Sequence, residues 1–473
     1  MEYDFVVVGG GSAGYAGART AVDLGLRTAV IEGGRDVGGL CILRGCMPSK
    51  TLLESARRFR VLQRAAEFGL GLDHPRFDAA AIIERKKRLV TEFADYRKGQ
   101  LEAGRFDFIR GEAVFLGPNE VSVREFDGTD RIIRSKSFLL ATGSKIAVPL
   151  VPGLAEAGCL TSDDMLDRTE ISDSLIVLGG GPVALELASY CRAFGSRVTL
   201  IQRSPHILSS TDADVARSLE AALREDGIEI HTGTRLLRVE KEEQVRRVIF
   251  EKDGREMAVE ARDILNALGR TPQLAGTQNL GLQLLGGRID ADIHQRTSVV
   301  NVFAAGDVCG PCEVVHVAIQ QGEVAAANAA SLLGVRSGPL KSMDYRLKLF
   351  AVFSEPQLAC VGASEAELHA SGTAYFTANY PFNDHGKSLV MGETAGFVKI
   401  TASKETGEIL GAAVVGPEAA ELIHELTVAM HYRATAQDFA TIPHYHPTLS
   451  EIWTYPAEEI ASQIIPRVDL VGE

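Results

Sequence analysis

The chain has 473 residues, of which 45% are hydrophobic and 23% are charged, and this length predicts several domains rather than one core. Its formal net charge of −13 argues against nucleic acid or an acidic membrane surface as a main partner. The N-terminal segment MEYDFVVVGGG has no basic region before its apolar run, and no charge-free apolar stretch is long enough to span a bilayer. We therefore expect neither a secretory signal nor a membrane partner.

A glycine-rich turn follows the first apolar segment. Residues 4–8 (DFVVV) predict a buried strand that leads into Gly9, Gly11 and Gly14 with the spacing G-x-G-x-x-G. A helix of small residues follows, and then a strand, RTAVIE, that ends on Glu32. Glycines let the backbone approach a pyrophosphate, the helix N-terminus favours its charge, and the acid accepts a hydrogen bond from a ribose hydroxyl. This order of elements predicts a dinucleotide-binding site.

Two cysteines lie close together in GGLCILRGCMPSK, residues 38–50. A metal site would need closer pairs, repeated elsewhere with Cys or His partners, and no second pair of that type is obvious. A structural disulfide would need an oxidising compartment, whereas seven cysteines, an odd number, fit a reducing cytoplasm. We therefore interpret Cys41 and Cys46 as a redox-active pair. Pro48 favours the first turn of a helix, and so Cys46 would lie at a helix N-terminus, where the helix dipole stabilises a thiolate.

A second glycine motif lies in SLIVLGGGPVALELA, with Gly179, Gly181 and Ala184 at the three motif positions. The strand that follows, SRVTLIQRS, carries Gln202 and Arg203 where an acid would favour NAD. An arginine there can hold a 2′-phosphate, so the two residues favour NADP. The alternative interpretation of Arg203 is a solvated surface charge.

Three other features have two interpretations each. Arg44, beside the cysteine pair, either contacts an anionic substrate or points into water. The arginines at positions 57, 58, 60 and 64 most resemble a solvated helix face. Cys309 and Cys312 have thioredoxin-like spacing without the strand-to-helix context of that motif, so a second redox pair stays open.

Two nucleotide sites with a cysteine pair after the first imply a flavin and a nicotinamide that exchange electrons with a disulfide. The chain resembles the class I flavoprotein disulfide reductases, the group of dihydrolipoamide dehydrogenase, glutathione reductase and mercuric reductase. The segments that carry this resemblance, in family order, are residues 38–50, FLLATGS at 138–144, the second glycine motif, NALGRTP at 266–272, TSVVNVFAAGDV at 297–308 and HYHPTLSE at 444–451.

The resemblance implies an α/β fold with two Rossmann-like nucleotide-binding domains, for FAD and NAD(P), and an α+β C-terminal dimerisation domain. The expected divisions are an FAD-binding domain with the redox disulfide at 1–150, an NAD(P)-binding domain at 151–280, a central segment that completes the FAD site at 281–345, and a dimer-interface domain at 346–473. The resemblance also implies a homodimer, with FAD and NAD(P)(H) as cofactors and no resident metal.

The resemblance also implies two sets of cofactor-binding residues. The residues expected to bind FAD are Gly9, Gly11, Gly14, Glu32, Lys50, Thr142, Gly143 and Asp307. The residues expected to bind NAD(P) are Gly179, Gly181, Ala184, Gln202, Arg203 and Gly269. Asp307 would bind the ribityl or phosphate part of the flavin and Glu32 the adenosine ribose. Lys50 would lie near the flavin N5 atom, with Glu186 as its partner.

The same resemblance assigns the catalytic roles. Cys46 would be the flavin-side thiol, and Cys41 the interchange thiol that attacks the substrate disulfide. His446 matches the HPTxxE pattern, in which Glu451 orients the imidazole as general base. A histidine suits thiol–disulfide interchange near neutral pH because imidazole titrates there. In this family the His–Glu pair comes from the partner subunit.

These features predict an FAD-dependent dithiol/disulfide oxidoreductase that passes electrons between NAD(P)(H), FAD and the Cys41–Cys46 disulfide. A lipoamide-like substrate is favoured over glutathione-like ones. Two alternatives stay open: an NADPH-dependent glutathione-type or metal-ion reductase, and a flavin-binding redox sensor without efficient turnover.

Overall fold

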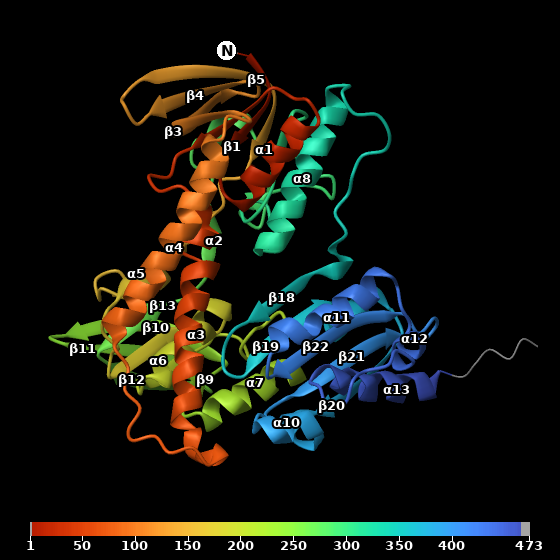
Figure 1. Ribbon diagram of the computed structural model, residues 1–473. Coiled ribbons are helices and arrows are strands. Elements are labelled where there is room, and N and C mark those ends of the chain that lie inside the picture. The colour runs from red at the N-terminus through yellow and green to blue at the C-terminus, as the bar shows by residue number, and fades with distance from the viewer. Residues whose placement is uncertain (1, 465–473) are drawn as a thin grey trace, which may run out of the picture.

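The computed structural model describes residues 2–464, which form three units, each built around its own sheets (Figure 1). In this view the first unit lies at the top, the second at the lower left and the third at the lower right. Two long helices, α3 (Cys46–Gln63) and α4 (Ala79–Glu102), run from the first unit down along the second. Within the described residues, no helix is both long and apolar enough to cross a membrane.

The first unit has a six-stranded sheet in which β1 lies between β2 and β5, with all three strands parallel where they pair. Its strands are β1 (Glu2–Val8), β2 (Thr28–Glu32), β3 (Asp107–Gly117), β4 (Glu120–Glu125), β5 (Asp130–Leu140) and β17 (Val302–Ala304). The outer parts of β3 and β5 pair with β4 as an antiparallel meander. The apolar run of β1 is buried because helices cover the parallel part of the sheet. The covering helices are α1 (Ser12–Asp23) and α8 (Val315–Leu332).

The second unit has a four-stranded parallel sheet in the order β13-β7-β8-β9. Its elements are α5 (Ser162–Asp167), β7 (Ser174–Leu178), α6 (Pro182–Ala193), β8 (Arg197–Ile201), α7 (Ala213–Glu225), β9 (Glu229–His231) and β13 (Asp263–Asn266). Side chains alternate along β7, so Ile176 packs towards an antiparallel three-stranded sheet and Val177 packs towards α6, α7 and α3. That antiparallel sheet consists of β10 (Thr234–Glu242), β11 (Val245–Lys252) and β12 (Arg255–Ala261).

A small two-stranded sheet marks the passage between the first two units. Strand β6 (Ser144–Ile146) follows β5, and it pairs antiparallel with β14 (Arg270–Pro272), which follows β13. The chain therefore enters and leaves the second unit side by side. After β14 it returns to the first unit through β15 (Leu284–Leu285), β16 (Arg288–Ile289) and β17.

The third unit has a five-stranded antiparallel sheet in the order β18-β19-β22-β21-β20. Its strands are β18 (Leu349–Val352), β19 (Gln357–Gly362), β20 (Tyr375–Pro381), β21 (Phe397–Ser403) and β22 (Ile409–Gly416). Its helices are α9 (Glu365–Ser371), α10 (Gly386–Met391), α11 (Ala419–His431), α12 (Ala436–Ala440) and α13 (Thr454–Gln463). Trp453 is fully buried among α11 and the sheet, and its indole donates a hydrogen bond to the carbonyl of Leu422.

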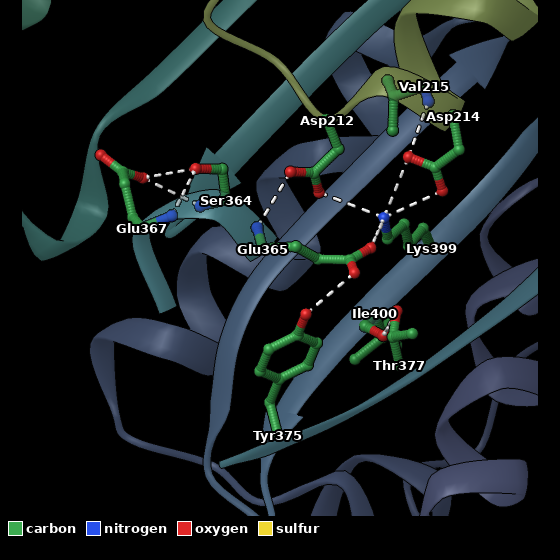
Figure 2. A network of polar contacts seen from close by, with 10 residues as sticks. All are labelled: Asp212, Asp214, Val215, Ser364, Glu365, Glu367, Tyr375, Thr377, Lys399 and Ile400. Atoms are coloured by element: carbon green, nitrogen blue, oxygen red, sulfur yellow. Dashed lines mark hydrogen bonds and ion pairs between the residues drawn. The ribbon is translucent and has the colours of Figure 1, made fainter. Parts of the chain in front are cut away.

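Lys399 joins the second and third units through a buried ammonium group (Figure 2). Its side chain is 2% exposed, and Nζ lies 3.1 Å from Asp212 and 2.9 Å from Asp214, at the start of α7. Glu365 at the start of α9 completes the cage and accepts a hydrogen bond from the Tyr375 hydroxyl at 3.0 Å. Burial alone would lower the pKa of Lys399, but these three carboxylates raise it well above its usual range. Lys399 therefore stays charged and ties the two units together.

Candidate active site

The first glycine turn forms a close backbone cradle between β1 and α1. Gly9 has φ +107°, and a Cβ there would collide with the carbonyl oxygen of Ala141, so this position requires glycine. A Cβ on Gly14 would collide with the carbonyl oxygen of Gly9. Gly11 caps α1, and Glu32 at the end of β2 accepts the Gly10 N–H at 2.8 Å. The predicted first motif therefore forms one site with its acid beside it, a shape that fits a dinucleotide.

The residues expected at the other end of the flavin lie where β5 and β17 end. Thr142 and Gly143 follow β5, and Asp307 follows β17, so parallel pairing brings them to one edge of the sheet. Ser144 donates a hydrogen bond to Asp307 at 2.6 Å, which fixes the carboxylate. Thr142 donates to the carbonyl of Gln273 at 2.6 Å. This edge also carries the glycine cradle, as expected for one elongated cofactor site.

The second glycine turn repeats the geometry of the first between β7 and α6. A Cβ on Gly179 would collide with the carbonyl oxygen of Ala267, Gly181 caps α6, and Ala184 is fully buried. Gln202 lies directly after β8, and its side chain lies against Gly180 as that of Glu32, the last residue of β2, lies against Gly10. The structure places the remaining two predicted residues at the rim of this turn: Arg203 is exposed, and Gly269 lies between β13 and β14.

The two cysteines lie on consecutive helices. Cys41 is in α2 (Gly39–Leu43), and Cys46 is the first residue of α3. A hydrogen bond from the Cys41 thiol lowers the pKa of Cys46 to about 7, and the positive charge of Lys50 adds to this effect. The same hydrogen bond, together with burial, raises the pKa of Cys41 well above its usual range. The reduced pair therefore holds a thiolate at Cys46 and a protonated thiol at Cys41 near neutral pH.

Lys50 lies one turn after Cys46 and is held by Glu186 of α6. The two Lys50–Glu186 hydrogen bonds are 2.8 and 2.9 Å long, and the Glu186 side chain is only 6% exposed. Glu186 also accepts the backbone N–H of Phe353 at 3.1 Å, and the Lys50 ammonium lies 4.8 Å from the centre of the Phe353 ring. Because the three residues come from different units, all three units meet at this ion pair.

His446 and Glu451 form the predicted pair at the far end of the chain. His446 Nδ1 lies 2.9 Å from one carboxylate oxygen of Glu451, and the Glu451 side chain is 10% exposed. The imidazole of His446 is 78% exposed. Nδ1 is held, so Nε2 is the nitrogen free to accept a proton from an incoming group.

The structure brings the sequence-predicted residues together in three places within one chain. The cysteines lie with Lys50 and Glu186, the first glycine turn lies with Glu32, and the second lies with Gln202. The His446 pair follows α12 in the third unit, whereas the cysteines lie on α2 and α3, and α12 and α2 lie well apart in Figure 1.

Most arginines near the cysteines form ion pairs. Arg44 is 43% exposed and pairs with Asp167 at 2.6 Å. On the helix face expected to be solvated, Arg58 is 72% exposed, as expected, whereas two other arginines form ion pairs between units: Arg57 binds Glu418 of the third unit at 2.9 Å. Arg60 binds Asp226 of the second unit with two hydrogen bonds of 2.8 Å. The sequence shows the spacing of these arginines along the helix, but their acidic partners come from distant segments.

The surroundings of two further clusters disfavour redox or metal chemistry. Burial raises the pKa of Cys309 to about 12 and also raises that of Cys312, which disfavours the thiolate that a redox pair needs. Among residues 2–464, one set of three carboxylates has the spacing of metal ligands, namely Asp212, Asp214 and Glu365. The ammonium of Lys399 lies among these three carboxylates.

Sequence reasoning missed His385. This residue is fully buried, and its Nε2 lies 3.3 Å from the second oxygen of Glu451, while its Nδ1 lies 2.9 Å from the Ser388 hydroxyl. Burial lowers the pKa of His385, which favours a neutral ring beside the carboxylate. No local pattern in the sequence marks His385, because its partner Glu451 lies in a different segment of the third unit.

Comparison with known proteins agrees with this geometry. Residues 3–322 match the family described as pyridine nucleotide-disulphide oxidoreductase, and residues 350–457 match its dimerisation domain. The dihydrolipoyl dehydrogenase of Bacillus subtilis is 34% identical over 464 residues, covering 95% of this chain and 96% of that protein. The leghemoglobin reductase of Vigna unguiculata is 32% identical, covering 95% of this chain and 86% of that protein.

Two solved structures have the same fold. The flavoprotein disulfide reductase RclA of Escherichia coli, solved as a Cu(II) complex, has a TM-score of 0.84 at 26% identity, covering 97% of this chain and 99% of that one. LpdA of Mycobacterium tuberculosis has a TM-score of 0.84 at 28% identity, with the same coverage.

These matches confirm the predicted fold class, with two Rossmann-like nucleotide-binding domains and an α+β dimerisation domain, which supports a homodimer. The glycine cradles and their neighbouring polar residues fit FAD and NAD(P)(H), which supply the two-electron transfer when bound. The chain belongs to the pyridine nucleotide-disulphide oxidoreductase family, as an FAD-dependent enzyme that links NAD(P)(H) to a dithiol/disulfide couple.

Proposed function

We propose that Cys41 and Cys46 are the redox pair of this enzyme, with Cys46 on the flavin side and Cys41 as the interchange thiol. The observation that carries this proposal is the thiolate-favouring position of Cys46, at the start of α3 and one turn from Lys50. A reduced Cys41 attacks one sulfur of the substrate and forms a mixed disulfide, and Cys46 then attacks Cys41 and releases the second substrate thiol. Overall, one disulfide, one NAD(P)H and one proton give two thiols and NAD(P)+.

Lys50 and Glu186 are proposed to position the flavin end of this pathway. Their ion pair orients the Lys50 ammonium and prevents it from rotating into solvent. Glu32 and Asp307 are proposed to hold the two ends of the flavin cofactor, beside the glycine and threonine residues of the first unit that the sequence predicts. Gln202 and Arg203 are proposed to hold the 2′-phosphate of NADPH, with the second glycine turn cradling the pyrophosphate.

His446 is proposed to be the general base, supplied by the partner subunit. Its large exposure and its separation from α2 within one chain support this role, because the imidazole is held by Glu451 yet faces outward. The proton that moves when Cys41 attacks or leaves the substrate would pass through His446 Nε2.

The four-part division of the chain and its cytoplasmic location also stay proposals.

The proposed substrate is a small or protein-bound dithiol/disulfide such as lipoamide. The relatives named dihydrolipoyl dehydrogenase support this class. A metal-ion reductase is the second candidate, because the structure of RclA was solved as a Cu(II) complex.

A panel of lipoamide, dihydrolipoamide, glutathione disulfide and Cu(II), each tested with NADH or NADPH or with the oxidised nicotinamides, distinguishes these candidates. We expect the highest specificity constant with the lipoamide couple. Turnover of Cu(II) alone would favour the metal-ion reductase. Full flavin reduction without turnover of any acceptor would favour the redox sensor.

A further inference from the structure

One arginine near the cysteine pair forms no ion pair with an acidic residue in the part of the chain that the structure describes. Arg97 lies on α4, half-buried, with its guanidinium carbon 4.1 Å from the centre of the Tyr15 ring. Its Nε atom is buried and has no hydrogen-bond partner among residues 2–464. Burial lowers the pKa of Arg97, and the largest charge effects on it come from Tyr15, Cys41, Tyr96 and Arg19. A buried N–H donor without an acceptor is costly, so an acceptor that reached Nε would stabilise this arrangement.

Other arginines around the redox helix contrast with Arg97. Arg44 is paired with Asp167, and Arg60 is paired with Asp226. Arg85, on the same helix as Arg97, donates to the carbonyl of Thr51, whereas the buried Nε of Arg97 has no acceptor among residues 2–464.

That location is beside the interchange thiol. Helix α4 packs against α2, which carries Cys41, and the charge of Arg97 interacts with Cys41. Gln100 lies three residues further along α4, on the same helix face, and its side-chain oxygen is also buried without a hydrogen-bond partner. Two polar groups without partners, one a donor and one an acceptor, thus lie on one face of α4, the helix that packs against the Cys41 helix.

We propose that Arg97 binds an anionic group, carboxylate or phosphate, of the disulfide substrate, and that Gln100 accepts a hydrogen bond from an N–H or O–H of the same molecule. The inference rests on the proposed dithiol/disulfide function and narrows its substrate class to disulfides that carry a negative charge near their sulfur atoms, with lipoate favoured over the neutral lipoamide. Arg97 takes part in no bond change, so the electron and proton balance of the reaction is unaltered. A planar guanidinium suits this task because it can bind a carboxylate or phosphate through two parallel hydrogen bonds.

The first test measures the reactivity of Cys41 and needs no disulfide turnover. The reduced holoenzyme is treated with iodoacetate, an anion, or with iodoacetamide, its neutral analogue, and peptide mapping measures the alkylation of Cys41. We expect Arg97→Gln to lower the iodoacetate-to-iodoacetamide rate ratio about tenfold or more. Arg97→Lys should keep part of the ratio. The matched control is Arg88→Gln, which removes an exposed charge from the same helix.

The second test uses two pairs of disulfides that differ only in charge, lipoate with lipoamide and 3,3′-dithiodipropionate with its diamide. The unaltered enzyme should favour the anionic member of at least one pair, and Arg97→Gln should reduce that preference about ten- to hundredfold, mainly through KM. An unchanged alkylation ratio in Arg97→Gln would overturn the inference. So would loss of FAD from this variant but not from Arg88→Gln, because the guanidinium would then serve the cofactor. If none of the four disulfides is reduced, the proposed function fails, whereas the alkylation ratio still decides whether Arg97 binds anions.

Discussion

His446 Nδ1 lies 2.9 Å from a carboxylate oxygen of Glu451, and this contact fixes which imidazole nitrogen faces outward. The other oxygen of Glu451 lies 3.3 Å from Nε2 of the buried His385. Glu451 is therefore held between two rings, one exposed and one enclosed. This arrangement orients the His446 ring with less freedom than a single surface pair would allow.

Replacing His446 by Gln should lower dithiol–disulfide turnover by about 10²–10⁴-fold, because a positioned general base is removed. Flavin reduction by the nicotinamide needs no such base and should stay near normal, and so stopped-flow measurement of both steps separates the two effects. Glu451→Gln should show a smaller loss of the same kind. His369→Gln, which alters an exposed histidine on α9, is the control. Full turnover in the His446 variant would show that this imidazole is not the base.

Replacing each cysteine by Ser should separate their roles. A thiolate beside oxidised flavin gives a long-wavelength absorbance band, so Cys41→Ser should show this band without reduction and Cys46→Ser should not. In the reduced unaltered enzyme, the pKa of Cys46, lowered to about 7 by the Cys41 thiol and Lys50, predicts that the band is present above pH 7 and disappears as the pH falls below that value. Absorbance spectra across this pH range provide the measurement.

Cys159→Ser is the control for the cysteine variants, because burial raises the pKa of that thiol to about 11 and no role is proposed for it. This variant should behave like the unaltered enzyme. A band that appears in Cys46→Ser instead would mean that the two cysteines have exchanged roles.

The nicotinamide preference should depend on Arg203. We expect a higher kcat/KM with NADPH than with NADH, and a reduction of this preference in Arg203→Ala by about ten- to hundredfold, because a charge-assisted contact to a phosphate contributes about 1.5–3 kcal/mol. Arg197→Ala, at the opposite end of β8, removes an exposed arginine and should leave the ratio unchanged. Equal use of both nicotinamides by the unaltered enzyme would contradict the interpretation of Gln202 and Arg203.

Replacing Lys399 by Met should destabilise the protein by about 3–5 kcal/mol, because three carboxylates would face one another around a cavity without their cation. The raised pKa of Lys399 means that this contribution is complete below the ordinary lysine pKa of about 10.4 and is lost only as the pH rises through the higher folded value. Urea unfolding midpoints at pH 7 measure the loss. Lys348→Met removes a more exposed ion pair with Glu367 and should cost at most about 1 kcal/mol.

The glycine turns and the cysteine helix could be predicted from the sequence because their physical causes are local. Gly9 and Gly179 adopt backbone conformations with positive φ that favour glycine, and Pro48 favours the first turn of α3. In each case the residue type itself explains the local structure. The match of Glu32 to the end of β2 follows in the same way, since strand length sets its position.

The ion pairs and isolated groups could not be predicted, because they depend on segments that meet only in three dimensions. Arg60 resembles any exposed helix arginine until Asp226 is placed beside it. His385 and Arg97 belong to no sequence motif: His385 is recognised by its contact with Glu451, and Arg97 by a buried Nε without a hydrogen-bond partner among the described residues. The sequence alone does not distinguish a residue that has a bonding partner from one that lacks it.

Helix α3 also limits how the enzyme can move. Its first residue is Cys46, and further along the helix Arg60 is fastened to Asp226 in the second unit and Arg57 to Glu418 in the third. Tilting α3 against either unit would stretch these ion pairs, so they favour a constant distance between the Cys46 sulfur and the second nucleotide site. Cofactor preference could therefore be re-engineered at the rim of the second unit without disturbing the path that electrons follow to the sulfur.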